Sequence, residues 1–156
     1  WYGRLALRNA VGSELLDLPV PLRTEYYAGA SQGFVKNLAD SCTSGVTLAL
    51  SNYKGNLSTG LVCARDSGTP GSSGVGCAAP AAVGSRYLAT AAAGDFNLIL
   101  AAPGAGRNGS VTVTATAPSW LKYDWRGTGT AINPSAMPAF GLFQGHPQRI
   151  YQNEVY

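Results

Sequence analysis

One acidic residue lies among aromatic side chains, in the run Trp120-Leu121-Lys122-Tyr123-Asp124-Trp125. Binding sites for small ligands combine aromatic faces with a few well-placed polar groups, and sugar rings are held in this way. Trp120, Tyr123, Asp124 and Trp125 are therefore candidate ligand-binding residues. A structural interpretation stays open beside this one: the rings would cover one end of the fold, and Asp124 would cap a turn or pair with Arg126.

Nucleophilic or hydrolytic catalysis has little support in the sequence. His146 is the single histidine and lies beside Pro147 in a turn-like segment, and no Gly-x-Ser-x-Gly motif is present. Glycoside hydrolysis needs a pair of carboxylates, and the chain has only eight acidic residues in all. The sequence therefore predicts a protein that is not an enzyme.

Three cysteines, Cys42, Cys63 and Cys77, allow one disulfide and leave one thiol. We expect the pair Cys63–Cys77, because these two bracket a Gly/Ser/Pro-rich loop that has little else to hold it. Closing a loop of this length contributes on the order of 3 kcal/mol in the chain-entropy model. Cys42–Cys63 is the alternative, and a reduced, buried Cys42 is expected otherwise. With no CxxC motif and one histidine, neither a metal nor a cofactor is predicted.

Short β-strands must position these residues. Apolar and polar residues alternate with period two, as in half-buried strands, in four segments: 3–8, 46–50, 96–101 and 110–116. Residues 19–27 add a strand whose two prolines favour an edge, since proline cannot donate to a ladder. About eight short strands separated by turn signals predict an all-β fold, an antiparallel β-sandwich of Greek-key or immunoglobulin-like type. A closed barrel is the alternative.

Two strand pairings are predicted. Residues 96–101 and 110–116 form the strongest hairpin candidate, because Asn108-Gly109 lies between them and both residues accept a positive φ. At the C-terminal end, residues 149–156 form an apolar, aromatic strand that needs a partner. The N-terminal run 2–9 is the candidate partner, since the termini of β domains are often held by sheet pairing.

The 156 residues are long enough for one domain, residues 1–156, which we expect to be a fragment of a larger exported protein. Residues 64–84 are rich in Gly, Ser and Ala and are predicted to be a loop insertion on the surface, where backbone polar groups reach water.

Composition narrows the functional classes. Charged residues make up 12%, about half of the ~25% usual in soluble domains, and abundant Gly and Ala are typical of extracellular surface β proteins. The net charge of +3 is spread along the chain without a Lys/Arg cluster, which argues against nucleic-acid binding. No run of eighteen apolar residues occurs, so this segment is not predicted to insert into a membrane.

Several short motifs follow one another in the order of a known family. They are Tyr2-Gly3-Arg4, Asn9-Ala10-Val11-Gly12-Ser13-Glu14, Pro19-Val20-Pro21-Leu22, Asp40-Ser41-Cys42-Thr43, Ala102-Pro103-Gly104, Gly109-Ser110-Val111 and a closing run that ends in Glu154-Val155-Tyr156. This series resembles the domain of unknown function at the C-terminal end of MshQ-like proteins. Those are large surface proteins associated with the mannose-sensitive haemagglutinin type IV pilus. None of the matching motifs is catalytic.

The resemblance implies a non-enzymatic extracellular domain of a pilus-associated protein at the bacterial cell surface, acting in adhesion or pilus assembly. Its partners would be other pilus or surface subunits and host or surface glycans. Two alternatives remain: a carbohydrate-binding module of a larger secreted protein, and a β-sandwich subunit that polymerises by strand exchange.

Overall fold

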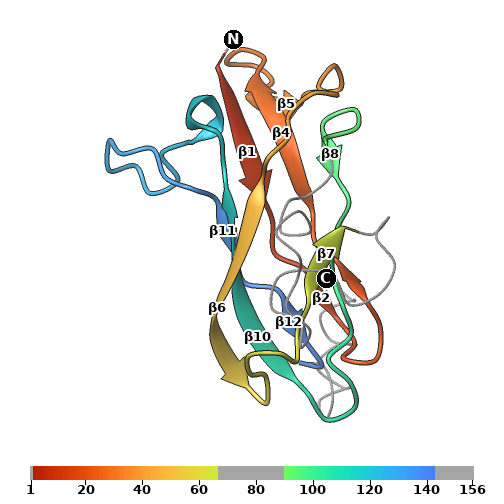
Figure 1. The fold of residues 1–156 in the computed structure, drawn as a ribbon. Helices are drawn as coiled ribbons and strands as arrows, with labels where there is room; N and C mark the ends of the chain where they lie inside the picture. Colours follow the sequence, from red (N-terminus) through yellow and green to blue (C-terminus); the bar gives the residue numbers. More distant parts are fainter. Residues whose placement is uncertain (1, 67–89, 143–156) are drawn as a thin grey trace, which may run out of the picture.

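The computed structural model describes residues 2–66 and 90–142, which fold mainly as short β-strands joined by turns and loops (Figure 1). In chain order the strands are β1 (Gly3–Leu7), β2 (Val11–Gly12), β3 (Leu18–Pro19), β4 (Leu22–Tyr27), β5 (Phe34–Lys36), β6 (Thr47–Gly55), β7 (Ala64–Asp66), β8 (Asp95–Phe96), β9 (Leu98–Leu100), β10 (Gly109–Thr116), β11 (Ser135–Ala136) and β12 (Ala139–Phe140). The 3-10 helix η2 (Ser119–Leu121) follows β10. Within the described residues, no helix has the length and apolar character needed to cross a membrane.

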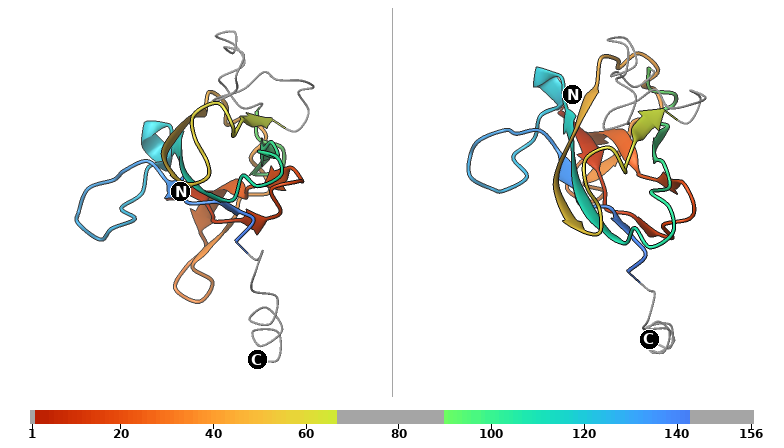
Figure 2. Two further views of the ribbon diagram at one scale, coloured as in Figure 1. Left: turned by 90° about the horizontal axis from the view of Figure 1, so that it is seen from below. Right: turned by 60° about the horizontal axis from the view of Figure 1, so that its bottom comes forward.

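The strands form two layers. One layer contains β1, β4, β5 and β8 and continues into β3, β9 and β7, because the β3–β4 and β8–β9 stretches run antiparallel to each other. At the junction the Val20 N–H donates to the Leu98 carbonyl at 3.0 Å. The second layer contains β6, β10, β11, β12 and β2. Seen from below, the strands curve around a central region (Figure 2). The buried apolar side chains form one core cluster. The predicted all-β fold of antiparallel sheets is confirmed, and β12 and β2 are the described pair that runs parallel.

The core follows from the predicted alternation. Along β10, Val111, Val113 and Ala115 are buried while the residues between them are half-buried. Leu5 and Leu7 of β1 are buried too, together with Ala6 between them, and Val46 and Leu48 are buried on the other layer. Each large apolar side chain removed from water in this manner contributes roughly 1.5–3 kcal/mol.

The hairpin predicted between residues 96–101 and 110–116 is wrong. β9 pairs with β3 and β7, whereas β10 pairs with β6, β11 and β12, so the two segments belong to different layers. The Asn-Gly pair meets the end of β6 instead. The Asn108 carbonyl accepts the Asn56 N–H at 2.8 Å, and a Cβ on Gly109 would overlap the Lys54 carbonyl oxygen. Glycine is required here for close approach of two strands.

Three further expectations are changed or remain open. The strand predicted for residues 19–27 is split into β3 and β4, where Pro21 has no N–H to offer a ladder. The first residues of the loop predicted for residues 64–84 form a strand instead, because Ala64–Asp66 is β7. The rest of that loop and the strand predicted for residues 149–156 lie outside the described residues, in which β1 pairs with β4.

The structure describes two of the three cysteines. Cys42 carries a free, exposed thiol, so neither its expected burial nor the alternative pair Cys42–Cys63 is correct. Cys63 is disulfide-bonded. Cys77 lies outside the described residues, and the pair Cys63–Cys77 stays a prediction.

Candidate binding site on the outer face of the sheet

Charged and aromatic side chains gather on one face of the sheet formed by β1, β4 and β5. Residues directly opposite each other on neighbouring strands share a face, and the register opposes Arg4 to Glu25 and Glu25 to Lys36. Tyr27 and Phe34 are opposed in the same way. The alternate positions, such as Leu5 and Leu22, are buried in the core. We call the surface that carries Arg4, Glu25 and Phe34 the outer face.

Glu25 lies at the centre of the outer face, and its side chain has no exposed surface. Its Oε2 accepts hydrogen bonds from Arg4, whose Nε and Nη2 both lie at 2.8 Å. Its Oε1 accepts from Arg23 Nε at 2.8 Å and from Arg8 Nη2 at 3.3 Å. Burial alone would raise the pKa of Glu25, but the hydrogen bonds and charges of Arg4 and Arg23 outweigh burial and hold this pKa below its usual range.

Arg4 is also surrounded by aromatic rings. Its guanidinium carbon lies 3.8 Å from the ring centre of Phe34, 4.7 Å from that of Trp125 and 5.0 Å from that of Tyr123. A cation is attracted to aromatic faces at such distances by the ring quadrupole. Tyr123 makes edge contacts with Phe34 and Trp125 at 5.2 Å and 5.0 Å between ring centres. The aromatic residues thus fix the arginine that holds Glu25.

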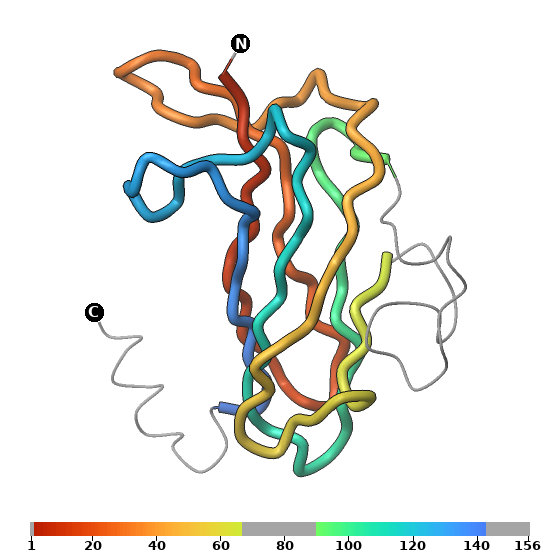
Figure 3. Tube along the Cα trace, turned by 60° about the vertical axis from the view of Figure 1, so that its left-hand side comes forward, coloured from red at the N-terminus to blue at the C-terminus, as the bar shows by residue number. Residues whose placement is uncertain are grey.

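Tyr123 and Trp125 reach the outer face from the loop of residues 123–132, which projects to the same side as the turn of residues 28–33 (Figure 3). A β-bridge between Tyr123 and Ile132 closes this loop. Inside it the Asp124 carboxylate accepts the backbone N–H groups of Thr128 and Gly129 at 3.0 Å and 2.6 Å. These hydrogen bonds hold the pKa of Asp124 below its usual range. Asp124 therefore organises the loop that presents Trp125.

A pocket of about 390 Å³ opens beside this cluster. Its lining combines the outer face with the neighbouring segments and consists of Arg4, Ala6, Leu7, Arg8, Asn9, Trp125 and Ser135. We call it the Arg8 pocket. The Arg8 side chain is 57% exposed and Trp125 is 37% exposed, and Asn9 and Ser135 are exposed as well. This arrangement offers a cation, an indole ring and two uncharged polar groups to a ligand.

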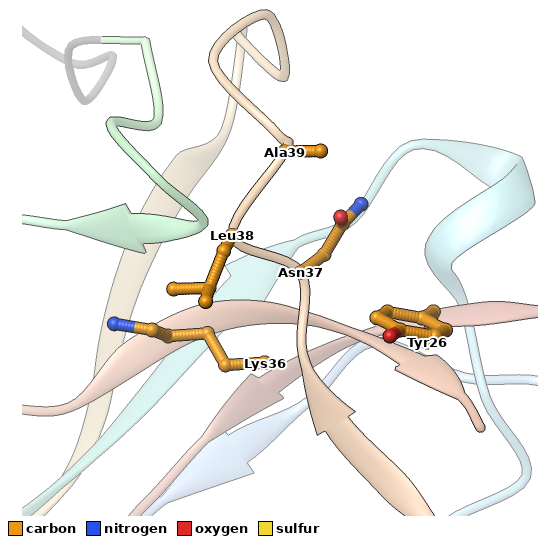
Figure 4. A pocket seen from close by; sticks show the side chains of 5 residues that line it. All are labelled: Tyr26, Lys36, Asn37, Leu38 and Ala39. Carbon is orange, nitrogen blue, oxygen red and sulfur yellow. The ribbon is translucent and has the colours of Figure 1, made fainter.

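A second pocket, of about 460 Å³, lies where the chain leaves β5, and Tyr26, Lys36, Asn37, Leu38 and Ala39 line it. In Figure 4 the Lys36 and Leu38 side chains lie on one side of this segment, and Asn37 and Tyr26 lie on the other. The Lys36 ammonium is already bound to Asp95 at 2.7 Å. Although this pocket is larger, it presents less polar chemistry to a ligand than the Arg8 pocket.

The four predicted binding residues do not all lie at one site. Tyr123 and Trp125 join the aromatic cluster, and Trp125 lines the Arg8 pocket. Asp124 accepts backbone N–H groups of its own loop, those of Thr128 and Gly129 at the distances given above. Trp120 lies on η2 and is 73% exposed. In the part of the chain that the structure describes, no group of three or more His, Cys, Asp or Glu residues is placed to hold a metal ion.

Arg4, Arg8, Glu25 and Phe34 were not among the residues predicted from the sequence. A signal for two of them was present, because the alternation of residues 3–8 that places Leu5 and Leu7 inward also places Arg4 and Arg8 together on the opposite face. The pairing of β1 with β4, which brings Glu25 under these arginines, had no such signal.

A family model covers nearly the whole chain. The model of the DUF6701 fourth domain matches residues 1–155. The chain belongs to the DUF6701 fourth-domain family. No curated protein and no solved structure matches this member of the DUF6701 fourth-domain family.

Proposed function

We propose that this DUF6701 fourth domain is a non-enzymatic extracellular domain of an MshQ-like, pilus-associated surface protein. Its role is adhesion or pilus assembly, and its binding surface is the outer face of the sheet. The motifs shared with the C-terminal domain of MshQ-like proteins support the placement, and the geometry of the outer face supports the binding role.

The observation that carries the binding role is the Arg8 pocket. Tryptophan and arginine are the residues that most often dominate the energy of binding interfaces. Here Trp125 and Arg8 are both exposed at the pocket, while the arginine next to them is fixed by three rings and a carboxylate. The pocket wall is thus held in place before a ligand arrives, and preorganisation reduces the cost of binding.

The acids near this surface support a binding role over a catalytic one. Glu25 is bound to three arginines, and Asp124 accepts two backbone N–H groups at short distances. Both carboxylates are stabilised in the ionised form, with lowered pKa values. A glycosidase instead needs one acid whose pKa is raised so that it can donate a proton.

A carbohydrate-binding module of a larger secreted protein is the second candidate. The indole of Trp125 at the pocket favours it, because aromatic faces are common partners of sugar rings. Both candidates use the same surface and differ in the parent protein.

The test measures binding of the purified 156-residue chain to immobilised glycans and to isolated mannose-sensitive haemagglutinin pili. We expect the wild-type chain to bind at least one of these surfaces, and Trp125→Ala to bind at least ~10-fold more weakly. Trp120→Ala is the matched control, since Trp120 is more exposed and does not line the Arg8 pocket. Equal loss in both variants would place the binding surface elsewhere, and turnover of a glycan would overturn the non-enzymatic assignment.

A further inference from the structure

We propose that the Arg8 pocket binds a carboxylate-bearing saccharide, with the sugar carboxylate at the Arg8 guanidinium and the ring against Trp125. This inference rests on the proposed binding function and adds the chemical class of the ligand.

The charge balance of the site favours an anion. Arg4, Arg8 and Arg23 share the single carboxylate of Glu25, so this group of four side chains carries an excess of two positive charges. A cation that is already desolvated on one side gains from an anionic partner more than a fully hydrated one does. The local excess is most accessible at Arg8, because it is the most exposed of the three arginines.

Arg8 is also the arginine with donors to offer. Its contact with Glu25 is a single one at 3.3 Å, whereas Arg4 and Arg23 approach to 2.8 Å. A guanidinium has five N–H donors in a planar fork that matches a carboxylate. The described contact uses one of these nitrogens, Nη2. A ligand carboxylate bound at Arg8 would therefore leave the buried Arg4–Glu25 and Arg23–Glu25 pairs in place.

The other residues of the pocket favour a saccharide over an acidic peptide. Trp125 provides an exposed aromatic surface next to Arg8, which a sugar ring covers and a Glu or Asp side chain does not. Asn9 accepts the Met137 N–H through Oδ1 at 2.7 Å, which orients the amide and keeps its two Nδ2 donors for other acceptors. Ser135 adds a hydroxyl that both donates and accepts. These groups suit the hydroxyls of a pyranose, and about 390 Å³ is within the range of small-ligand pockets.

The experiment measures the affinity of the 156-residue chain by calorimetry for oligogalacturonate, oligoalginate and sialyllactose. Each is compared with its methyl-esterified form, which keeps the rings and removes the charge. We expect at least one acidic saccharide to bind ~10-fold or more tightly than its ester. Arg8→Gln should remove most of this difference, and Trp125→Ala should weaken the acidic saccharide as well. Arg107→Gln is the matched control, because Arg107 is an exposed arginine that does not line the pocket.

Other results would overturn the inference. Equal affinity for acid and ester would show that the ligand's charge does not contribute to binding. An equal loss of affinity in Arg8→Gln and Arg107→Gln would show that the ligand does not bind in the Arg8 pocket. A poly-glutamate peptide that binds as tightly as the saccharides would assign the site to an acidic peptide. If no acidic saccharide binds although the chain still binds pili or a neutral glycan, the ligand class is wrong and the proposed function stands. If nothing binds, both are wrong.

Discussion

Glu25 balances three arginines from within the sheet, and its removal would leave their charges without a partner. Glu25→Gln keeps the size of the side chain and removes the charge. The arginines left without this partner are 18%, 57% and 31% exposed, so we expect a loss of about 1.5–3 kcal/mol in the free energy of unfolding, measured with denaturant. Asp95→Asn is the matched control: it breaks the Lys36–Asp95 pair, whose side chains are 31% and 49% exposed, and should cost no more than ~1 kcal/mol.

The same residue makes stability depend on pH. The pKa of Glu25 is lowered in the folded protein, so its contribution is complete above the usual pKa near 4.5 and is lost as the pH falls below it. Wild-type stability should therefore drop from about pH 5 downward, and Glu25→Gln should lack this part of the drop. A variant that follows the wild-type curve at a constant offset would contradict the assignment.

Asp40 gives a second, separable acid transition. Its side chain is buried, and its Oδ1 accepts the N–H groups of Cys42 and Thr43 at 3.1 Å and 3.0 Å. Burial alone would raise its pKa, but hydrogen bonds, those from Thr43 foremost, lower the pKa to about 2. The stability that Asp40 contributes is present above pH 3.8 and is lost as the pH falls toward about 2. Asp40→Asn should flatten this window, because the amide keeps an acceptor but does not ionise. Asp40→Ala should lose about 2 kcal/mol at pH 7, because it removes the hydrogen bonds to the carboxylate.

At the scale of elements, the pair β6–β10 depends on two glycines. Gly109 has φ +151° and lies against the Lys54 carbonyl, while Gly55 has φ +69° and would place a Cβ 2.7 Å from the Asn108 carbonyl. Because both neighbours are backbone atoms, neither can move aside as a flexible side chain would. The end of this strand pair is therefore restricted to glycine at both positions.

Gly109→Ala tests this restriction against Gly129→Ala. Gly129 also has a positive φ, +82°, but open space around it, so its alanine variant should cost only the ~1–2 kcal/mol of the unfavourable conformation. Gly109→Ala adds overlap with backbone, worth ~1–3 kcal/mol or more. Thermal unfolding of the two variants should show the larger loss for Gly109→Ala. Equal losses would mean that β6 and β10 do not approach closely at this point.

The sequence predicts the strands themselves better than their pairing, because burial along a strand follows from its own residues. The alternation in residues 46–50 and 110–116 reports burial directly, and both segments are strands with the expected inward side chains. The partner of a strand is not a local property. Asn108-Gly109 therefore predicted a turn, whereas its glycine serves a contact with Gly55, more than fifty residues away in the chain.

At the scale of the whole molecule, the disulfide is the remaining covalent question. We expect peptide mapping without reductant to recover Cys63 linked to Cys77, since Cys63 is disulfide-bonded and Cys42 is free. Cys63→Ser with Cys77→Ser should lose on the order of 3 kcal/mol in the free energy of unfolding. Cys42→Ser should change it by no more than ~0.5 kcal/mol. A free thiol at Cys77 would contradict the pairing.

The candidate site was predictable only in part, because its residues come from segments that are far apart in the chain. Tyr123 and Trp125 stood out as aromatic residues beside an acid, and both lie at the Arg8 pocket or its supporting cluster. The charged half of the site comes from residues 4–8 and from Arg23 and Glu25 of β4, more than ninety residues earlier. Asp124, the acidic residue of the predicted site, accepts backbone N–H groups of its own loop instead.

The pairing of residues 3–12 has a further consequence. β1 belongs to one layer through β4, while β2, four residues later, belongs to the other through its parallel pairing with β12. Residues 3–12 thus connect the two layers. Separating the layers along this side requires breaking either the β1–β4 or the β2–β12 pairing, so the hydrogen-bonded amides of both pairs should be protected from exchange with solvent.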